Sequence, residues 1–185
     1  MRCIGYEDEY AKDGQILVNL AKTLIEYYSN NPENLGNYQM IIVPSANPDG
    51  LIEGKNNWRV GTEGAFGRCT ADGVDMNRDF KAGEFKAVES QKLKELMDEY
   101  KMDIHIDFHG WEDSVIGNPT IVKAFRSEVG ITKDKSNRYG SGQGYLIEYT
   151  KNTYGAKSAI VEFKNSKSVN STKVEKALNK IMQEI

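Results

Sequence analysis

The chain of 185 residues is long enough for a single domain, residues 1–185, with a core that needs no disulfide or metal to hold it together. Its 24 basic and 27 acidic side chains are interspersed and give a formal charge of −3, so no basic stripe is available to bind a nucleic-acid backbone. Two cysteines, Cys3 and Cys69, are too few for a disulfide framework and are expected to be free thiols.

The sequence contains no segment that predicts membrane insertion. No apolar run approaches the roughly 20 residues that cross a bilayer, and the first ten residues, MRCIGYEDEY, lack the apolar core of a signal peptide. We therefore expect a soluble protein without a membrane partner. Its compartment stays open, because the chain as written would be cytoplasmic but would be secreted if a leader had been removed.

Three features fill the first eighty residues. Residues 13–29 place apolar side chains at helical spacing and predict a helix that faces the core. The continuous apolar run QMIIVPS at 39–45 predicts a strand buried on both faces of a sheet. Residues 46–79 are rich in glycine and asparagine and predict a long loop, a kind of segment that is usually functional in a compact domain.

The second half alternates between helices and strands. Residues 85–100 predict a helix, and DIHIDFHGW at 103–111 alternates strictly between apolar and polar residues, as a strand does. This order predicts the α/β class, with a mostly parallel or mixed sheet covered by helices on both faces. The remaining predicted elements are a helix after Pro119, a helix over 144–151, a strand over 157–163 and a last helix that opens with a Thr172–Glu175 capping box.

Polar residues follow or end the predicted strands. Asn47 and Asp49 follow the first strand, His109 ends the second and Glu162 lies near the end of the third. Because ligands of open α/β sheets bind beyond the carboxyl ends of the strands, these side chains are candidates for one site. A buried carboxylate such as Glu162 must be paired or used, since desolvating it unpaired is costly.

Structural explanations compete with the functional one. Glu162 could form a salt bridge with Lys157 or Lys164, and His109 could be a core histidine satisfied by Asp107 or by the backbone. Of the two histidines, His109 is expected to be the accessible one, because it lies at the strand end. His105 is expected to be structural.

Four motifs in order resemble the zinc metallocarboxypeptidase family, the M14 peptidases: NPDG at 47–50, GVDMNRDF at 73–80, IDFHGW at 106–111 and AIVEF at 159–163. Each motif alone is weak, but the four lie in register after matching helices and strands and span nearly the whole chain. The resemblance implies the zinc-carboxypeptidase fold. It also implies hydrolysis of a peptide or amide bond adjacent to a free C-terminal carboxylate.

The resemblance assigns roles to four matched residues. His109 matches the second histidine ligand of the zinc, and Glu162 matches the catalytic glutamate, the general base that activates water. Asn77 and Arg78 match the clamp on the substrate carboxylate, and a planar guanidinium offers paired donors that suit the two oxygens of that group. The implied cofactor is one Zn²⁺ per chain.

Two further roles are matched less closely. Arg68 is the counterpart of the arginine that polarises the scissile carbonyl and stabilises the oxyanion, with Arg59 as the alternative. Tyr139 matches the mobile tyrosine that closes over substrate, and Tyr145 competes with it. Residues 145–149, YLIEY, are expected to supply the floor of the specificity pocket.

The first zinc motif of the family, His-x-x-Glu, is incomplete. Glu7 falls on the glutamate ligand, but Ile4 falls where the histidine should be. A catalytic zinc normally has three protein ligands, so Glu7 and His109 alone would hold the metal weakly or not at all. The family also has sheet strands before the position that Met1 matches, so the fold is expected to lack N-terminal edge strands.

Three explanations for this departure stay open. The chain could be a catalytically inactive remnant that still binds carboxylates or peptides. Another chain could supply the missing ligand or cover the missing sheet edge in an oligomer. A substitute ligand could also come from Cys3, Asp8 or Glu9, because thiolates and carboxylates bind zinc.

The expected activity is that of a metallocarboxypeptidase, with a peptide that bears a free C-terminal carboxylate as the partner. The substrate could be a protein or a cell-wall peptide. The alternatives are the carboxylate-binding remnant and an N-acyl amino acid deacylase, which related folds also provide.

Overall fold

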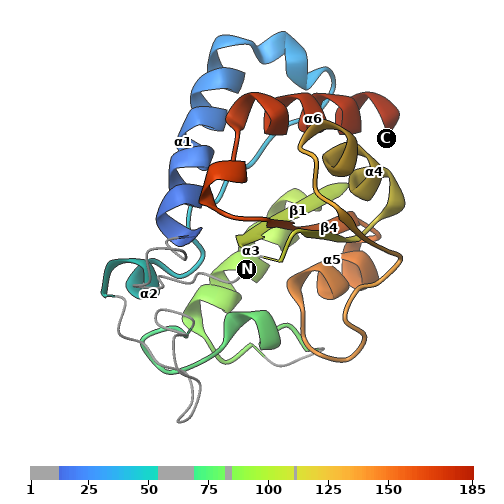
Figure 1. Cartoon of the computed structure of the whole chain (residues 1–185). Helices are drawn as coiled ribbons and strands as arrows, with labels where there is room; N and C mark the ends of the chain where they lie inside the picture. Colours follow the sequence, from blue (N-terminus) through green and yellow to red (C-terminus); the bar gives the residue numbers. More distant parts are fainter. Residues whose placement is uncertain (1–12, 54–68, 82–84, 111) are drawn as a thin grey trace.

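The computed structural model describes residues 13–53, 69–81, 85–110 and 112–185 (Figure 1). Within these residues the chain alternates between helices and strands, as the sequence predicts for an α/β domain. The helices are α1 (Asp13–Asn30), η1 (Pro32–Leu35), α2 (Pro48–Glu53), η2 (Met76–Arg78), α3 (Val88–Tyr100), α4 (Pro119–Glu128), α5 (Leu146–Tyr154), η3 (Ser166–Ser168) and α6 (Ser171–Glu184). The strands are β1 (Ile104–Gly110), β2 (Ser114–Gly117), β3 (Lys133–Ser136) and β4 (Lys157–Phe163).

The described strands form one mixed sheet in the order β1-β4-β2-β3. Strands β1 and β4 are parallel, β2 is antiparallel to β4, and β2 and β3 are parallel. Residues far apart in sequence are thereby paired at fixed register, including His109 with Glu162 and Asp107 with Ile160. The predicted mixed sheet is confirmed, and two of its strands, β1 and β4, lie where the sequence predicts them.

Helices cover both faces of this sheet (Figure 1). Helices α1, α4 and α6 lie on one face, where they bury the main hydrophobic cluster against side chains of β1, β2 and β4. Helices α3 and α5 lie on the other face and enclose a smaller cluster of Phe80, Met97 and Leu146. This two-sided cover explains why β4 is buried along almost its whole length.

The strand predicted over 39–45 is wrong. These residues form neither a helix nor a strand, although Met40 and Ile42 pack against the main cluster. Ile41 is 42% exposed, so the run is not buried on both sides. An apolar run predicts burial, but a strand also needs a backbone partner, and none of the described strands pairs with these residues.

Two short strands and one cap were not predicted correctly. The four-residue strands β2 and β3 were missed, and β3 has the sequence KDKS, whose charges suit the edge of a sheet but give no apolar signal. The predicted Thr172–Glu175 capping box is also wrong. Helix α6 begins at Ser171, and the Asn170 side chain caps it by accepting a hydrogen bond from the Lys173 backbone N–H at 3.0 Å.

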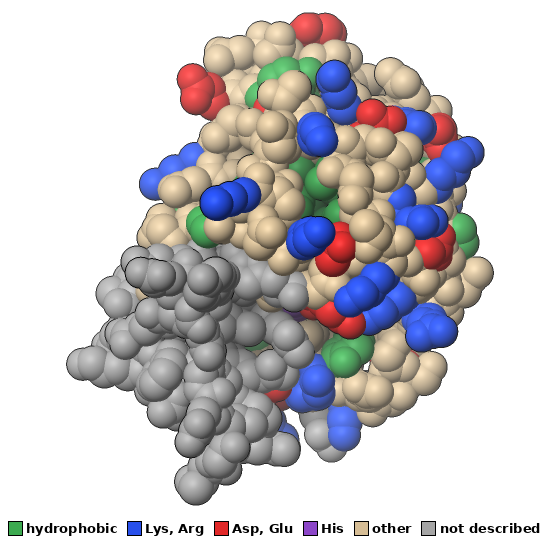
Figure 2. Space-filling view, viewed as in Figure 1, with side chains coloured by type: hydrophobic (Ala, Val, Ile, Leu, Met, Phe, Trp, Pro, Cys, Tyr) green, Lys and Arg blue, Asp and Glu red, His purple; other side chains and the backbone are tan. Residues whose placement is uncertain are grey.

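Figure 2 shows one face of the molecule, on which acidic and basic side chains of the described residues are interspersed. None of the described helices is both long and apolar enough to span a membrane.

Candidate active site

The centre of the candidate site is a contact between neighbouring strands. Because β1 and β4 run in parallel with His109 paired to Glu162, both side chains lie on the same face of the sheet, near the carboxyl ends of their strands. The Nδ1 atom of His109 lies 3.6 Å from Oε1 of Glu162. Both residues are buried, and His109 is 0% exposed, so the expectation that His109 is the accessible histidine is wrong. The structure therefore brings together the two residues matched to the zinc histidine and the catalytic glutamate.

Glu162 is not explained by a structural ion pair. It forms no salt bridge with Lys157 or Lys164, and its Oε1 atom instead lies beside the His109 ring in the described part of the chain. Its Oε2 atom is buried and has no hydrogen-bond partner among the described residues. A buried carboxylate oxygen without a donor is costly, so this atom points to a water, a metal or a substrate group at this place.

On its other side, His109 contacts Asp107. Nε2 of His109 lies 2.9 Å from Oδ2 of Asp107, and both side chains are fully buried. Burial alone would raise the pKa of Asp107, but several favourable interactions, of which that with His109 is the largest, together hold the pKa below its usual range. Asp107 entered the sequence interpretation only as a structural partner of His109. Its spacing of two residues on an alternating strand is the signal that places it beside that histidine.

His105 lies two residues before Asp107 and has a different environment. Its Nδ1 atom lies 3.1 Å from Oγ1 of Thr150, and this hydroxyl is within 2.8 Å of the Ser158 hydroxyl. Burial lowers the pKa of His105 to about 4, so its imidazole is neutral at neutral pH. These contacts link β1 to α5 and β4, which is the structural role that the sequence suggested.

Asn77 and Arg78 form the short helix η2, which is fixed from both flanks. The Asp75 carboxylate caps it by accepting a hydrogen bond from the Asn77 backbone N–H at 3.1 Å. On the other side, the Asp79 carboxylate accepts hydrogen bonds from the backbone N–H groups of Lys86 and Ala87, just before α3. The pair thus belongs to a well-anchored turn, which favours a positioned group over a solvated loop.

The side chains of this pair are arranged for polar recognition. Nη1 of Arg78 donates to the backbone oxygen of Asn77 at 2.7 Å, and the guanidinium carbon lies 4.6 Å from the ring centre of Tyr145. Asn77 is only 5% exposed, and its Oδ1 atom has no hydrogen-bond partner among the described residues. A cation held over an aromatic ring is oriented while most of its donors stay available.

Gly144 places Tyr145 at this position. Its φ is +80°, and a Cβ added there would lie 2.8 Å from the carbonyl carbon of Arg78 and closer still to the oxygen. The backbone N–H of Phe80 also donates to the Gly144 oxygen at 3.1 Å. Only glycine fits both the close approach and the left-handed conformation, so this residue holds the loop before α5 against η2. Sequence reasoning did not single it out.

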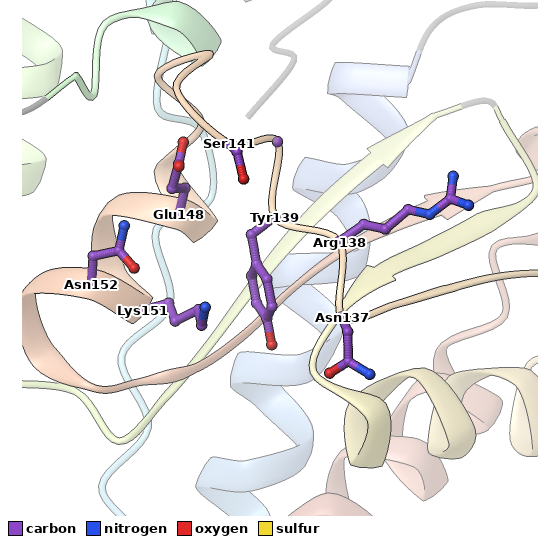
Figure 3. A pocket seen from close by; sticks show the side chains of 8 residues that line it. Asn137, Arg138, Tyr139, Ser141, Glu148, Lys151 and Asn152 are labelled. Atoms are coloured by element: carbon purple, nitrogen blue, oxygen red, sulfur yellow. The ribbon is translucent and has the colours of Figure 1, made fainter.

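Tyr139 lies in a different environment, a polar pocket of about 510 Å³ between residues 137–141 and α5 (Figure 3). The Lys151 ammonium lies 4.3 Å from the ring centre of Tyr139, and burial raises the pKa of the tyrosine hydroxyl. Glu148 borders the same pocket, where its carboxylate accepts hydrogen bonds from the Gly142 backbone N–H. None of His109, Glu162, Asn77 and Arg78 lines this pocket.

Residues 145–149, the expected floor of the specificity pocket, lie in different environments. Leu146 and Ile147 are buried in the protein, so neither is presented to a ligand, whereas Glu148 borders the Tyr139 pocket. Tyr145, not Tyr139, contacts Arg78.

The described residues thus form two groups, His109 with Asp107 and Glu162, and Asn77 with Arg78 and Tyr145. No hydrogen bond or ion pair between described residues joins the two groups directly. The described side chains also contain no cluster of three or more His, Cys, Asp or Glu arranged to hold a metal ion. The other predicted residues lie outside the described ranges: Ile4, Glu7, the possible substitute ligands Cys3, Asp8 and Glu9, and the arginines Arg59 and Arg68.

Comparison with known proteins decides the family. A sequence model of the zinc carboxypeptidase family matches residues 14–177, which is most of the chain. The chain belongs to the zinc carboxypeptidase family. This confirms the resemblance of the four motifs.

Individual relatives of this zinc carboxypeptidase domain are longer than the chain. Bacteriocin BCN5 of Clostridium perfringens is 35% identical over 202 aligned positions, which include 96% of this chain but only 22% of the bacteriocin. The chain therefore spans about a fifth of that curated relative.

Two solved structures are similar in fold. A metallo-carboxypeptidase from Burkholderia cenocepacia superposes with a TM-score of 0.50 at 19% identity, over 76% of this chain and 42% of that one. A metallo-carboxypeptidase from Pseudomonas aeruginosa, in complex with (2-guanidinoethylmercapto)succinic acid, gives a TM-score of 0.46 at 18% identity, over 76% and 43% of the two chains. The first of these supports the carboxypeptidase-like fold.

Proposed function

We propose that this domain catalyses metallocarboxypeptidase-type hydrolysis, cleaving the peptide or amide bond next to a free C-terminal carboxylate. The observation that carries the proposal is the buried Glu162 carboxylate, which lies 3.6 Å from His109 and keeps one oxygen without a partner among the described residues. Family membership supports the same reaction class. A carboxylate in this state is the group that a general base requires.

The donor set fits a zinc ion in part. His109 supplies an imidazole nitrogen directed toward Glu162, and we propose Glu7, outside the described residues, as the second ligand. When bound, zinc polarises a carbonyl and lowers the pKa of a water ligand to about 7. Glu162 then accepts a proton from the attacking water and delivers it to the leaving amine.

Asn77 and Arg78 hold the substrate carboxylate in this proposal. The guanidinium, which lies over Tyr145, offers paired donors to the two carboxylate oxygens, and the Asn77 amide binds the same group from the side. Holding the terminus at one place selects the last bond for cleavage. Arg68, or alternatively Arg59, is proposed to stabilise the oxyanion. The contact with Arg78 supports Tyr145 over Tyr139 as the tyrosine that closes on substrate.

A bacterial cell-wall peptide is the substrate class to test first. The relative from Clostridium perfringens carries the name Bacteriocin BCN5. This supports cell-wall peptides over ordinary protein C-termini.

The second candidate is a module that binds carboxylates without hydrolysis. It is favoured by one feature of the sequence, Ile4, which occupies the position of the first zinc histidine and cannot bind the metal. The clamp of Asn77 and Arg78 does not depend on zinc, so the chain could bind carboxylates even without catalytic activity.

Metal analysis and peptide hydrolysis distinguish the two candidates. The hydrolase needs a third zinc ligand in place of Ile4, from the same chain or a partner; with that ligand, protein purified without added zinc is expected to contain about one zinc per chain and to release the C-terminal residue of a peptide. Glu162→Gln keeps the shape of the side chain but removes the base, so it is expected to lower kcat by about 100-fold or more while peptide binding persists. A folded, metal-free wild-type protein that binds a C-terminal dipeptide and does not cleave it would establish the binding module instead.

A gain-of-function variant adds a second test. Ile4→His restores the histidine of the family motif and is expected to raise both zinc affinity and hydrolysis. No gain in either would show that more than this ligand is missing.

A further inference from the structure

Two opposite charges on α5 are kept apart from each other. Glu148 and Lys151 are three residues apart in this helix, a spacing at which opposite charges commonly form an ion pair. The Glu148 carboxylate instead accepts hydrogen bonds from the Gly142 backbone N–H at 2.9 and 3.0 Å. The Lys151 ammonium lies over the Tyr139 ring, 4.3 Å from its centre. Among the described residues, neither charge forms an ion pair with the other or with a third side chain.

Both charges border the polar pocket of about 510 Å³ beside Tyr139. A pocket of this size accommodates a small-molecule group. Arg138 also borders the pocket, but its guanidinium extends away from Glu148 and Lys151 (Figure 3). The pocket therefore presents one carboxylate and one ammonium, each held by a different neighbour and neither neutralised by the other.

A ligand group that carries both an ammonium and a carboxylate matches these two charges. Its carboxylate can pair with Lys151 and its ammonium with Glu148, whose two oxygens share a single N–H donor and keep further acceptor positions. Glu148 is half-buried and Lys151 is exposed, so each pair is expected to raise affinity by about 3 to 5-fold. A ligand group with one charge gains from only one of the two pairs.

This pocket adjoins the predicted carboxylate clamp across one aromatic ring. Gly140 borders the pocket, and a Cβ added to it would lie 2.0 Å from Cδ2 of Tyr145, so its backbone lies directly against that ring. The Arg78 guanidinium carbon lies 4.6 Å from the centre of the same ring. A residue whose α-carboxylate is held by Arg78 therefore has to pass only the Tyr145 ring to place its side chain in the pocket.

We propose that the pocket beside Tyr139 receives the side chain of the C-terminal residue of the substrate. Glu148 and Lys151 then select a side chain that ends in both an ammonium and a carboxylate group. Together with its own α-carboxylate, such a residue is a diamino-dicarboxylic acid. The proposal rests on the proposed function, because it takes Arg78 as the group that holds the terminal carboxylate.

Four peptides that differ only in their C-terminal residue test this selection. They end in diaminopimelate, which has both distal charges, in lysine, which has only the ammonium, in α-aminopimelate, which has only the carboxylate, or in norleucine, which has neither. Binding to the wild-type protein is measured by calorimetry with a chelator present, so that no zinc-dependent hydrolysis occurs. We expect the diaminopimelate peptide to bind about 10 to 25-fold more tightly than the norleucine peptide, with the other two peptides between them.

Glu148→Gln and Lys151→Gln are matched controls for each other. Glutamine at position 148 keeps an oxygen that accepts from the Gly142 N–H, so the loop stays anchored while the charge is lost. Glu148→Gln is expected to abolish the gain from the ligand ammonium and to keep the gain from its carboxylate. Lys151→Gln is expected to do the reverse. A purely structural effect would instead weaken all four peptides equally.

Arg78→Gln tests whether the pocket and the clamp act on the same ligand. It is expected to weaken all four peptides by a similar factor and to leave their order unchanged. Unchanged affinities in this variant would overturn the proposal, because they would separate the pocket from the clamp.

The remaining outcomes distinguish the pocket from the reaction. Equal affinities of the four peptides for the wild type, or no binding of any of them, would overturn the assignment of the pocket, and so would equal losses for all peptides in both pocket variants. Equal affinities together with cleavage would leave the proposed hydrolysis in place. A zinc-loaded protein that cleaves none of the peptides but still prefers the diaminopimelate peptide would remove the proposed hydrolysis and support the pocket as a binding site.

Discussion

Replacement of Gly144 by alanine tests whether the loop before α5 is held against the predicted carboxylate clamp. The residue has φ +80°, and an added Cβ would lie 2.8 Å from the Arg78 carbonyl carbon, so Gly144 and Arg78 must move apart. Gly142 in the same loop is the matched control. Its φ is +72°, but a Cβ there would meet no atom within 4 Å.

Both variants place an alanine in the left-handed conformation, but only Gly144→Ala also strains a hydrogen bond. A left-handed alanine costs about 1 to 2 kcal/mol, and Gly142→Ala is expected to lose only this much. Gly144→Ala also strains the hydrogen bond from the Phe80 N–H to the Gly144 oxygen, which contributes about 0.5 to 1.5 kcal/mol. We therefore expect Gly144→Ala to lower the free energy of unfolding by about 1.5 to 3.5 kcal/mol.

Urea unfolding measures this difference, and substrate kinetics show its consequence. Because Tyr145 follows Gly144 and lies over Arg78, the displaced loop is expected to raise KM for a carboxylate-terminated peptide in Gly144→Ala but not in Gly142→Ala. Equal losses of stability in the two variants would refute the reasoning, since they would show that the close approach to Arg78 has no energetic weight.

Two further predictions concern stability. The folded-state pKa of His105 is lowered from 6.5 to about 4, so its contribution to stability is present above pH 6.5 and is lost as the pH falls toward 4. The free energy of unfolding is therefore expected to decline less steeply with acid in His105→Gln than in the wild type. Parallel curves of unfolding free energy against pH for variant and wild type would contradict this. Asn170→Ala removes the cap of α6 and is expected to lower the free energy of unfolding, measured by heat or urea, by about 1 kcal/mol. Thr172→Ala, at the residue predicted from the sequence as the cap, is expected to lower it by less. A larger loss in Thr172→Ala than in Asn170→Ala would contradict the observed cap.

Local sequence patterns were sufficient for the elements with strong periodicity. The strict alternation of β1 and the apolar run of β4 predicted both strands, and helical spacing predicted α1, α3 and α6. The same apolar criterion failed for residues 39–45, because hydrophobicity indicates burial but does not supply a backbone partner. The edge strand β3 was missed for the opposite reason, since its backbone pairs with β2 while its charged residues give no apolar signal.

The sequence by itself determined the residue types and motifs that place this chain in the zinc carboxypeptidase family, including His109, Glu162 and the Asn77–Arg78 pair. Only the tertiary structure decided that Glu162 lies beside His109, that Asp107 contacts the far side of the same imidazole, and that Tyr145 rather than Tyr139 contacts Arg78. The reason is physical. Side-chain periodicity is a local property of the chain, whereas strand register and the close approach of Gly144 to Arg78 arise from pairing and packing between residues that are distant in sequence.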